Sequence, residues 1–542
     1  MEASLERVKE HGAVFTKPWM VDFMLDLCGY TPDENLAQRV VVEPSCGDGA
    51  FLLPIVERLS KSCRTWGIDI LDARPAIRAF DLQPEHVATC RMGVARWLLE
   101  DGWPERTAAE LAECWVSCED YLLRGSENEN ADLVVGNPPY IRAESIPRDL
   151  RSAYVEKCHT MTDGSDIYVA FYEIGLRSLK PNGVLCFICA DRWMRNAYGK
   201  RLRQMVSEDY DVRAVYEMHG VDAFAEEVSA YPAVTLIGRG TQGPVRYAVA
   251  HQTFNGEAST RLEQWAANGS GSVRDRDFSA AVLEDWFRTE TSWPTGSPER
   301  IAFLRDLEDR LPLLENTGAR VGIGIATGAD AVFVTDDASL VEESRLLPLL
   351  KTTDISSGRV VWQGSWLVNP WDTQGSLVSL EGYPRLTAYL TTHSEQLRSR
   401  HVAKKSNGAW YRTIDKVNPD LQRKHKLLLP DMKMTIAPVL DEGAYYPHHN
   451  LYWIEPGSWD VRVLGGLLLS RVAEVFIASY AVRMRGGTLR FQAQYLRRIR
   501  VPDPAGIPAE VASALVDAFN NRDVEAATAA ALLAYGIDRI PD

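Results

Sequence analysis

Residues 40 to 59 read VVVEPSCGDGAFLLPIVERL, and this stretch decides how the first half of the chain is expected to fold. A β-branched apolar run, a turn containing Gly47 and Gly49, and an amphipathic helical pattern follow one another. A doubly wound parallel sheet begins its ligand site with this order of elements. The glycines permit the conformations and the close approach that a backbone around a ligand needs. The stretch therefore predicts an α/β, Rossmann-like sheet with a small-molecule site at this turn.

The chain around this stretch divides into three parts. Apolar runs alternate with helical patterns up to about residue 240, as in repeated βαβ units, and strands are expected at 39–44, 64–70, 131–137, 183–191, 212–218 and 233–239. Residues 241–300 are polar and punctuated by Gly and Ser, so we interpret them as an irregular connection of uncertain assignment. Residues 301–542 mix short strands with aromatic loops and end in an Ala-rich helical pair, which predicts a second, mixed α+β domain.

Composition places the chain among folded proteins of the cytoplasm. It has 542 residues, of which 46% are hydrophobic and 25% charged, and its N-terminus is charged where a signal peptide is apolar. No run approaches the roughly 18 apolar residues of a membrane span. The nine cysteines are odd in number, which indicates free thiols in a reducing compartment. Cys186 and Cys189 have CxxC spacing but lie in an apolar run, so core packing is expected and no metal site is predicted.

The acid at the end of the first expected strand indicates which ligand the turn binds. No Lys follows the glycines, so a Walker A phosphate loop is absent, and Glu43 favours a cation over a pyrophosphate. S-adenosylmethionine carries a sulfonium and an ammonium and fits this acid. Asp69 ends the next expected strand and can accept the ribose hydroxyls, while Asp120 and Tyr121 follow a third strand and can bind adenine. Any one of these acids alone could instead be a helix cap or a surface residue.

The sequence GNPPY at residues 136–140 follows a buried strand and suggests chemistry on an amine. An amine conjugated to an aromatic ring is a poor nucleophile because its lone pair is delocalised. The side-chain oxygen of Asn137 and the carbonyl of Pro138 can accept its hydrogens, and the prolines hold these acceptors in place. Tyr140 offers a face for stacking a planar base. The alternative is a stiff loop, since Asn-Pro and Pro-Pro are common turn signals.

A base in a duplex cannot reach such a loop, so it would have to be flipped out and held between two rings. Phe224, just before an expected strand, is the candidate for the second ring. From the local pattern alone, a core phenylalanine in a turn is an equally good interpretation.

These motifs together resemble the amino-methylating DNA adenine methyltransferases of the gamma arrangement, typified by the TaqI enzyme. The resemblance is close over residues 11 to 240, where GAVFTKP, EPSCGDGAF, GIDI, EDYLL, GNPPY and FAEEVSAYPAV occur in the family's order. It implies a class I methyltransferase sheet, catalytic roles for Asn137, Pro138 and Tyr140, and stacking of the target base on Tyr140 and Phe224. It implies cofactor contacts by Thr16, Pro18, Glu43, Gly47, Gly49, Asp69, Ile70, Asp120, Tyr121, Pro139 and Phe171.

The second half resembles, more loosely, the specificity domain of that family, and its charge agrees with this. The net charge of −15 argues against a generally basic surface, yet residues 398–426 hold nine Lys and Arg against two Asp, and residues 483–500 hold six Arg and no acid. A solvated face is the plain alternative. The DNA contacts we expect are Lys404, Lys405, Arg412, Lys416, Arg423, Lys424, Lys426, Arg483, Arg485 and Arg490.

The sequence therefore predicts a domain of residues 1–240 that binds S-adenosylmethionine, a connection of residues 241–300 and a DNA-recognition domain of residues 301–542. The expected activity is N6 methylation of a flipped-out adenine at a specific site in double-stranded DNA. A separately encoded restriction endonuclease is a possible partner by family analogy, and no membrane partner is expected. Two alternatives stay open. The loop also serves methylation of RNA bases and of protein glutamines, and the fold could be a DNA reader without turnover.

Overall fold

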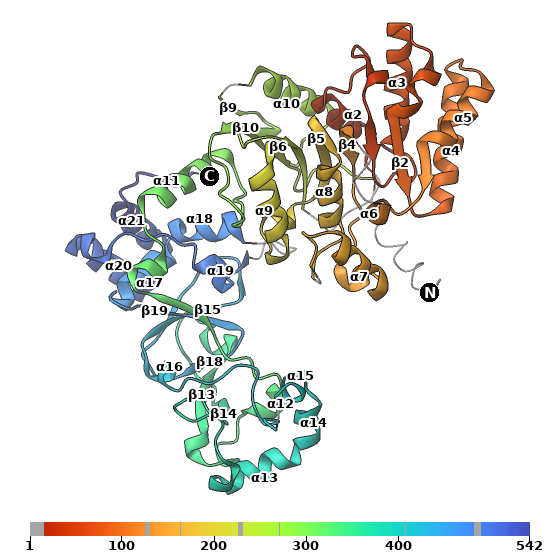
Figure 1. Ribbon diagram of the computed structural model, residues 1–542. Helices are drawn as coiled ribbons and strands as arrows, with labels where there is room; N and C mark the ends of the chain where they lie inside the picture. Colours follow the sequence, from red (N-terminus) through yellow and green to blue (C-terminus); the bar gives the residue numbers. More distant parts are fainter. Residues whose placement is uncertain are drawn as a thin grey trace. The chain divides into compact units, whose positions relative to one another are not determined.

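The computed structural model describes residues 16–124, 130–162, 164–225, 231–269, 271–406, 408–481 and 489–541 (Figure 1). The chain separates into two compact units, Met1–Ala302 and Phe303–Asp542, and each is described here by itself.

A ten-stranded sheet organises the first unit, with the strand order β3-β2-β1-β4-β5-β7-β6-β8-β10-β9. Strands β3, β2, β1, β4 and β5 pair in parallel, whereas β7 runs antiparallel to both β5 and β6. The predicted Rossmann-like sheet is confirmed in this parallel half. The strands are β1 (Val41–Glu43), β2 (Ile77–Asp81), β3 (Val116–Cys118), β4 (Ala131–Gly136), β5 (Leu179–Ala190), β6 (Tyr210–Glu217), β7 (Pro232–Arg239), β8 (Val245–Ala250), β9 (Ser272–Arg274) and β10 (Phe278–Leu283).

Both faces of this sheet are covered, because successive residues of a strand point to opposite faces. Val41 and Leu133 belong to one buried cluster, and their neighbours Val42 and Val134 belong to another. Residues of α2 (Pro18–Leu27), α3 (Leu52–Trp66), α4 (Pro84–Glu100), α5 (Glu105–Trp115) and α10 (Gly256–Asn268) complete the first cluster. Residues of α6 (Tyr121–Arg124), α7 (Arg148–Lys157), α8 (Tyr168–Arg177) and α9 (Lys200–Asp209) complete the second. Continuous apolar strands fit this double coverage.

The strand predicted at residues 64–70 is wrong. Helix α3 continues to Trp66 and ends at Gly67, which has a φ of 66° and whose amide bonds back to the carbonyl of Arg64. A left-handed glycine of this kind is a common helix terminus. The following residues form a 3₁₀ helix, Ile70–Ala76, and the second strand comes only at Ile77–Asp81. The alternating apolar residues around Gly67 imitate a strand, whereas Arg78 interrupts the true one.

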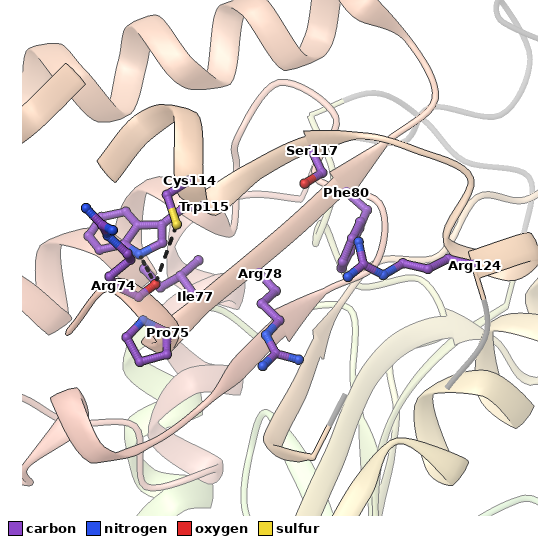
Figure 2. Close-up of a pocket in the computed structure, with 9 residues that line it drawn as sticks. All are labelled: Arg74, Pro75, Ile77, Arg78, Phe80, Cys114, Trp115, Ser117 and Arg124. Atoms are coloured by element: carbon purple, nitrogen blue, oxygen red, sulfur yellow. Dashed lines mark hydrogen bonds between the residues drawn. The ribbon is translucent and has the colours of Figure 1, made fainter. Parts of the chain in front are cut away.

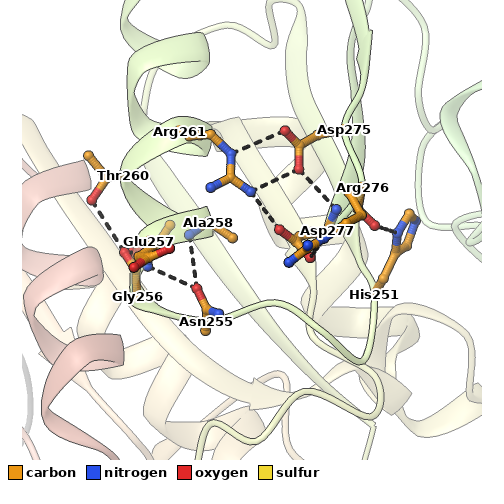
Figure 3. Close-up of polar contacts among 11 residues, drawn as sticks. His251, Asn255, Gly256, Glu257, Ala258, Thr260, Arg261, Asp275, Arg276 and Asp277 are labelled. Carbon is orange, nitrogen blue, oxygen red and sulfur yellow. Dashed lines mark hydrogen bonds and ion pairs between the residues drawn. The ribbon is translucent and has the colours of Figure 1, made fainter.

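The irregular connection expected at residues 241–300 is also wrong, because three strands and α10 form there. Strand β8 pairs in parallel with β6, so this segment extends the sheet of the first unit. Figure 3 shows how α10 is fixed: Arg261 bonds the carboxylates of Asp275 and Asp277 between β9 and β10, and Asn255 caps the helix. Polar composition misled the prediction, since these polar side chains bind one another within an ordered edge of the sheet.

The second unit contains small sheets and helices, as the prediction of a mixed α+β domain requires. One four-stranded sheet has the order β11-β19-β15-β17, another has the order β12-β14-β13-β18, and β16 pairs with β20. The strands are β11 (Arg320–Ile323), β12 (Val334–Thr335), β13 (Leu346–Leu350), β14 (Trp366–Val368), β15 (Lys426–Pro430), β16 (Met432–Lys433), β17 (Val439–Asp441), β18 (Tyr446–Pro447), β19 (Leu451–Glu455) and β20 (Leu489–Arg490).

Helices complete the second unit, and the Ala-rich pair predicted at the end of the sequence is confirmed as α20 (Ala509–Asn521) and α21 (Val524–Tyr535). The others are α12 (Asp330–Phe333), α13 (Pro384–Thr392), α14 (Ser394–Ser399), α15 (His401–Lys404), α16 (Asp420–Arg423), α17 (Val461–Leu469), α18 (Arg471–Tyr480) and α19 (Ala493–Leu496), while α11 (Pro298–Arg310) contains the boundary between the units. Among the described residues, no helix is both long and apolar enough to span a membrane.

Candidate active site

The glycine turn and the GNPPY loop lie side by side, because each follows a strand of the same parallel pair. Val42 of β1 is in register with Val134 of β4, so the carboxyl ends of the two strands meet at one edge of the sheet. The Ser45 hydroxyl lies 3.4 Å from the backbone carbonyl of Asn137, which it can reach as a donor. Open α/β sheets place their ligands at this edge. The two motifs predicted separately from the sequence therefore belong to one site.

Both glycines of the turn adopt conformations that other residues avoid. Gly47 has a φ of 53° and Gly49 a φ of 93°. A Cβ at Gly47 would meet no atom within 4 Å, so its surroundings are open. The Gly47 amide donates a 2.9 Å hydrogen bond to Asp81 Oδ2, and the neighbouring Cys46 amide bonds the carbonyl of Phe80. The turn is thus held against the end of β2 and leaves space above Gly47.

Glu43, the last residue of β1, is a buried acid in an acidic surrounding. It is only 2% exposed, and its Oε2 has no hydrogen-bond partner among the described residues. Burial, together with the nearby Cys90, Asp81 and Asp48, raises the pKa of Glu43 well above its usual range. A buried carboxylate of this kind is costly unless a cation accompanies it. The site therefore has the electrostatic character that a positively charged ligand requires.

Asp81 replaces Asp69 as the carboxylate at the end of the second strand. Asp69 is exposed and caps a 3₁₀ helix by accepting a bond from the amide of Leu71, and Ile70 is fully buried in the core. Neither stands at the end of β2, so the premise for their cofactor roles is removed. Asp81 stands there, and the side chain of the next residue, Leu82, is 55% exposed.

One signal in the sequence could have found Asp81. Pro84 begins α4, and proline is favoured at the first position of a helix. An acid three residues before such a proline, at the end of a short apolar stretch, marks the strand-to-helix turn where a ribose carboxylate is expected.

Asp120 and Tyr121 follow β3, where the sequence predicts them. Asp120 Oδ1 accepts bonds from the amides of Leu122 and Leu123, and its Oδ2 accepts a 2.8 Å bond from the Tyr154 hydroxyl. Its carboxylate is thus already a cap and an acceptor: both acceptor sites of Oδ1 are used, and Oδ2 has a second site for a ligand.

Aromatic rings line the same corner of the sheet. The rings of Tyr121 and Phe171 are stacked at 5.9 Å between centroids, and the ring of Phe80 lies 5.5 Å from that of Tyr121 in a tilted arrangement. The structure therefore brings Tyr121 and Phe171 together, as the resemblance implies, and adds Phe80, which the sequence analysis missed.

A surface pocket of about 340 Å³ lies along β2 and β3, and Phe80 of this corner is one of its lining residues (Figure 2). Three arginines line it, and acids already pair with two of them: Arg74 with Glu110, and Arg124 with Glu119 at 2.8 Å. Neither Glu43 nor Asn137 is among its lining residues. The pocket is basic, so it does not share the acidic character of the site around Glu43.

The residues of the GNPPY loop are partly buried at the end of β4. The Asn137 side-chain amide donates a 3.2 Å bond to the Thr16 hydroxyl, and no described residue donates to the Pro138 carbonyl. Pro138 is buried and Pro139 half-buried. The Tyr140 hydroxyl lies 3.5 Å from the carbonyl of Ile188 in β5, and burial raises the pKa of that hydroxyl. Tyr140 is therefore a neutral ring held at the loop.

Thr16 and Phe224 join this loop from distant parts of the sequence. They form an antiparallel bridge, and the amide of Lys17 bonds the carbonyl of Ala223. The ring of Phe224 lies 6.5 Å from the ring of Tyr140, with an interplanar angle of 82°. Pro18 is exposed at the first position of α2. The structure thus gathers Thr16, Asn137, Tyr140 and Phe224, with the two rings edge to face.

The basic residues predicted to contact DNA differ in how the structure places them. Lys404, Lys405, Lys416, Arg423 and Lys424 are exposed, and Arg412 is half-buried over the ring of Trp371. Lys426 is a correction: its side chain is 0% exposed and pairs with Asp441 at 2.6 Å inside the second unit. It opens β15, a buried strand, so it cannot contact a phosphate. Arg483 and Arg485 lie outside the described residues, and Arg490 ends β20.

Comparison with known proteins finds relatives along nearly the whole chain. A model of the Eco57I restriction-modification methylase family matches residues 97–224. The Type II methyltransferase M.PaeR7I of Pseudomonas aeruginosa is 41% identical over 98% of this chain and 92% of its own length. The Type II methyltransferase M.XhoI of Xanthomonas vasicola is 41% identical over 98% of both chains.

A solved structure with the same fold is that of the Type IIL restriction-modification enzyme MmeI in complex with DNA. It has a TM-score of 0.58 and 12% identity, and the match covers 97% of this chain and 75% of that one. This likeness concerns the fold, and it agrees with the Rossmann-like sheet and second domain described above.

Proposed function

The chain belongs to the Type II DNA methyltransferases of restriction-modification systems, and we propose that it methylates N6 of an adenine flipped out of duplex DNA. The observation that carries the proposal is the meeting of Glu43 and the GNPPY loop at one edge of the sheet. In this proposal the acidic surrounding of Glu43 accommodates a cationic methyl donor, and Asn137 and Pro138 beside it supply two acceptors for an amine.

S-adenosylmethionine is the donor we propose, and when bound it supplies an electrophilic methyl group. Glu43 suits its positive end, because a cation compensates the cost of that buried carboxylate. Asp81 suits the ribose hydroxyls at the end of β2, and Leu82 can cover one face of the adenine. Thr16, Pro18, Gly47, Gly49, Asp120, Tyr121, Pro139 and Phe171 complete the proposed contacts.

Asn137 and Pro138 activate the target amine in this proposal. The Asn137 side-chain oxygen and the Pro138 carbonyl accept the two N6 hydrogens, which localises the nitrogen lone pair. The nitrogen then forms a bond to the methyl carbon as the carbon–sulfur bond breaks. The methylated nitrogen afterwards releases one proton to solvent, so no strong base is needed. Preorganised acceptors of this kind typically contribute about 100-fold to 1000-fold in rate.

Tyr140 and Phe224 are the proposed walls of the base pocket. Two ring faces that sandwich a base must be parallel and roughly 7 Å apart, because each contact needs about 3.5 Å. The observed rings are perpendicular, and Phe224 is 6% exposed. We therefore expect one ring to turn when the base enters, which is a conformational step coupled to base flipping.

The exposed basic residues of the second unit are the proposed phosphate contacts. Lys404, Lys405, Lys416, Arg423 and Lys424, with half-buried Arg412, remain candidates, as do Arg483, Arg485 and Arg490. Phosphate contacts contribute most of the affinity for DNA, and contacts to base edges determine which sequence is recognised. A restriction endonuclease that cuts the same site is the proposed biological partner.

The test is transfer of a tritium-labelled methyl group from S-adenosylmethionine to plasmid DNA, followed by digestion to nucleosides. The label is expected in N6-methyl-2′-deoxyadenosine. Asn137→Ala should lose at least about 100-fold in rate while still binding the cofactor. Structured RNA and a glutamine-containing protein serve as competing substrates. Label in either of these, or in a cytosine product, would contradict the proposed substrate.

A further inference from the structure

Three side chains that bind metals in other proteins converge inside the second unit. Asp330 is the first residue of α12, and His448 and His449 directly follow β18. One oxygen or nitrogen atom from each lies within 4.8 Å of the others. Asp330 Oδ2 and His448 Nε2 lie 3.0 Å apart. Asp330 and His448 come from segments 118 positions apart, so the fold creates this cluster.

Backbone pairing holds the segments that carry these side chains. His448 bridges Ile325 in parallel fashion, and its amide donates a 2.9 Å bond to the carbonyl of Leu350. The amide of His449 bonds the carbonyl of Ile325 at 3.0 Å. A Cβ on Gly324 would come within 2.2 Å of the carbonyl oxygen of His448. The two backbone segments therefore approach so closely that only glycine fits at position 324. Backbone hydrogen bonds therefore fix the positions of the segments that carry the three side chains.

The chemistry of the three atoms suits a borderline metal ion. Two imidazole nitrogens and one carboxylate oxygen form a common ligand set for Zn²⁺, with bonds of about 2.0–2.2 Å. The Asp330–His448 bond uses only two of the three groups. The Nδ1 of His449 is buried and has no hydrogen-bond partner among the described residues. A metal ion bound through Nδ1 would satisfy that nitrogen, and the Asp330 carboxylate offsets the nearby positive charge of Lys351.

We propose that Asp330, His448 and His449 bind one divalent transition-metal ion, for which Zn²⁺ is the best chemical match. This departs from the sequence prediction of no metal site, which considered only the CxxC spacing. Three protein ligands leave a fourth position to water. The ion would link the turn before α12 to the end of β18. That turn also pairs with the segment of Ile414 and Asp415, whose amides bond the carbonyls of Thr327 and Ala326.

This site is independent of methyl transfer, and its test needs no activity measurement. Tag-free full-length protein is incubated with ZnSO₄, passed over a desalting column and analysed for zinc by mass spectrometry. We expect about one equivalent per chain in the wild type and in His425→Ala, which removes an exposed histidine of the same unit. We expect loss of that equivalent in His449→Ala and in Asp330→Asn.

Co²⁺ gives a second readout that does not depend on mutant stability. When Co²⁺ binds to the wild type, its visible absorption should be typical of four or five nitrogen and oxygen ligands. Added Zn²⁺ should abolish this absorption by displacing the Co²⁺. The proposal is overturned if the wild type retains no zinc and shows no such spectrum. It is equally overturned if a folded His449→Ala variant binds zinc as the wild type does.

Discussion

The side-chain amide of Asn137 donates a hydrogen bond to the hydroxyl of Thr16, 3.2 Å away and 121 positions earlier in the chain. This bond orients the amide, because a nitrogen that faces Thr16 turns the oxygen to the opposite side. The oxygen is the atom that the proposed mechanism needs for the target amine. In the proposed mechanism Thr16 is therefore a positioning residue for the GNPPY loop, and its backbone bridge to Phe224 holds it there.

Replacing Thr16 with valine tests this orientation. Thr16→Val keeps the shape of the side chain but removes the acceptor, and loss of one hydrogen bond of about 1 kcal/mol predicts a roughly fivefold to tenfold lower kcat. KM for DNA should stay close to that of the wild type. Thr16→Ser, which retains the hydroxyl, should restore the rate. Steady-state kinetics that show equal losses in both variants would instead indicate a packing role.

Asp81 and Asp69 distinguish the observed second strand from the predicted one. Asp81→Asn should weaken binding of S-adenosylmethionine by about tenfold or more, since a charge-assisted hydrogen bond is worth about 1.5–3 kcal/mol. Asp69→Asn, a cap substituted by another good cap, should leave that affinity unchanged. Isothermal titration calorimetry on both variants checks the pair. The reverse order of effects would restore Asp69 to the cofactor site.

Glu43→Gln should make the cofactor-free protein more stable and weaken its binding of S-adenosylmethionine. Because burial raises the pKa of Glu43, ionising this acid in the folded protein opposes folding, and the opposition grows as pH rises above the ordinary range of a glutamate. The cofactor-free variant should therefore be more stable than the wild type by about 1–2 kcal/mol, with a larger gap at pH 8 than at pH 5. It should also gain less stability from S-adenosylmethionine. Thermal unfolding at both pH values, with and without cofactor, measures this, and a destabilised variant would argue against a buried, uncompensated charge.

The lysines of the second unit should act in two different ways. Lys404→Ala combined with Lys405→Ala should weaken DNA binding and reduce the slope of log K against log salt by up to about 0.9 for each phosphate that these lysines neutralise. Lys426→Met breaks a buried ion pair, so it should cost about 3 kcal/mol of stability with little change in that slope. Salt titrations of DNA binding and urea unfolding separate the two effects. A lower slope in folded Lys426→Met protein would return this residue to the DNA surface.

The parts of the fold that the sequence predicted correctly have strong local signals. Residues 40–59 combine a β-branched run, two glycines and a helical pattern, and all three appear in the structure up to α3. The strand before GNPPY is likewise a short, continuous apolar run, and it forms β4. Buried parallel strands produce such runs because both of their faces are covered.

The parts that the sequence did not predict depend on distant partners. Gly67 ends a helix, although apolar and polar residues alternate around it as they do in a strand. Lys426 belongs to a cluster of positive charge, yet it is buried because Asp441 pairs with it from the adjacent strand β17. The polar residues 241–300 are ordered by contacts such as those of Arg261 with Asp275 and Asp277. Composition cannot reveal which charged side chains find partners.

The most direct measurement of the central claim is a map of methylated adenines. The protein is expressed in cells that lack adenine methylation, and their genome is read by single-molecule sequencing, with Asn137→Ala as the matched control. The account predicts N6-methyladenine at one recurrent sequence motif in cells with the wild type and none in cells with the variant. A genome without N6-methyladenine, from cells that contain folded protein able to bind S-adenosylmethionine, would contradict it.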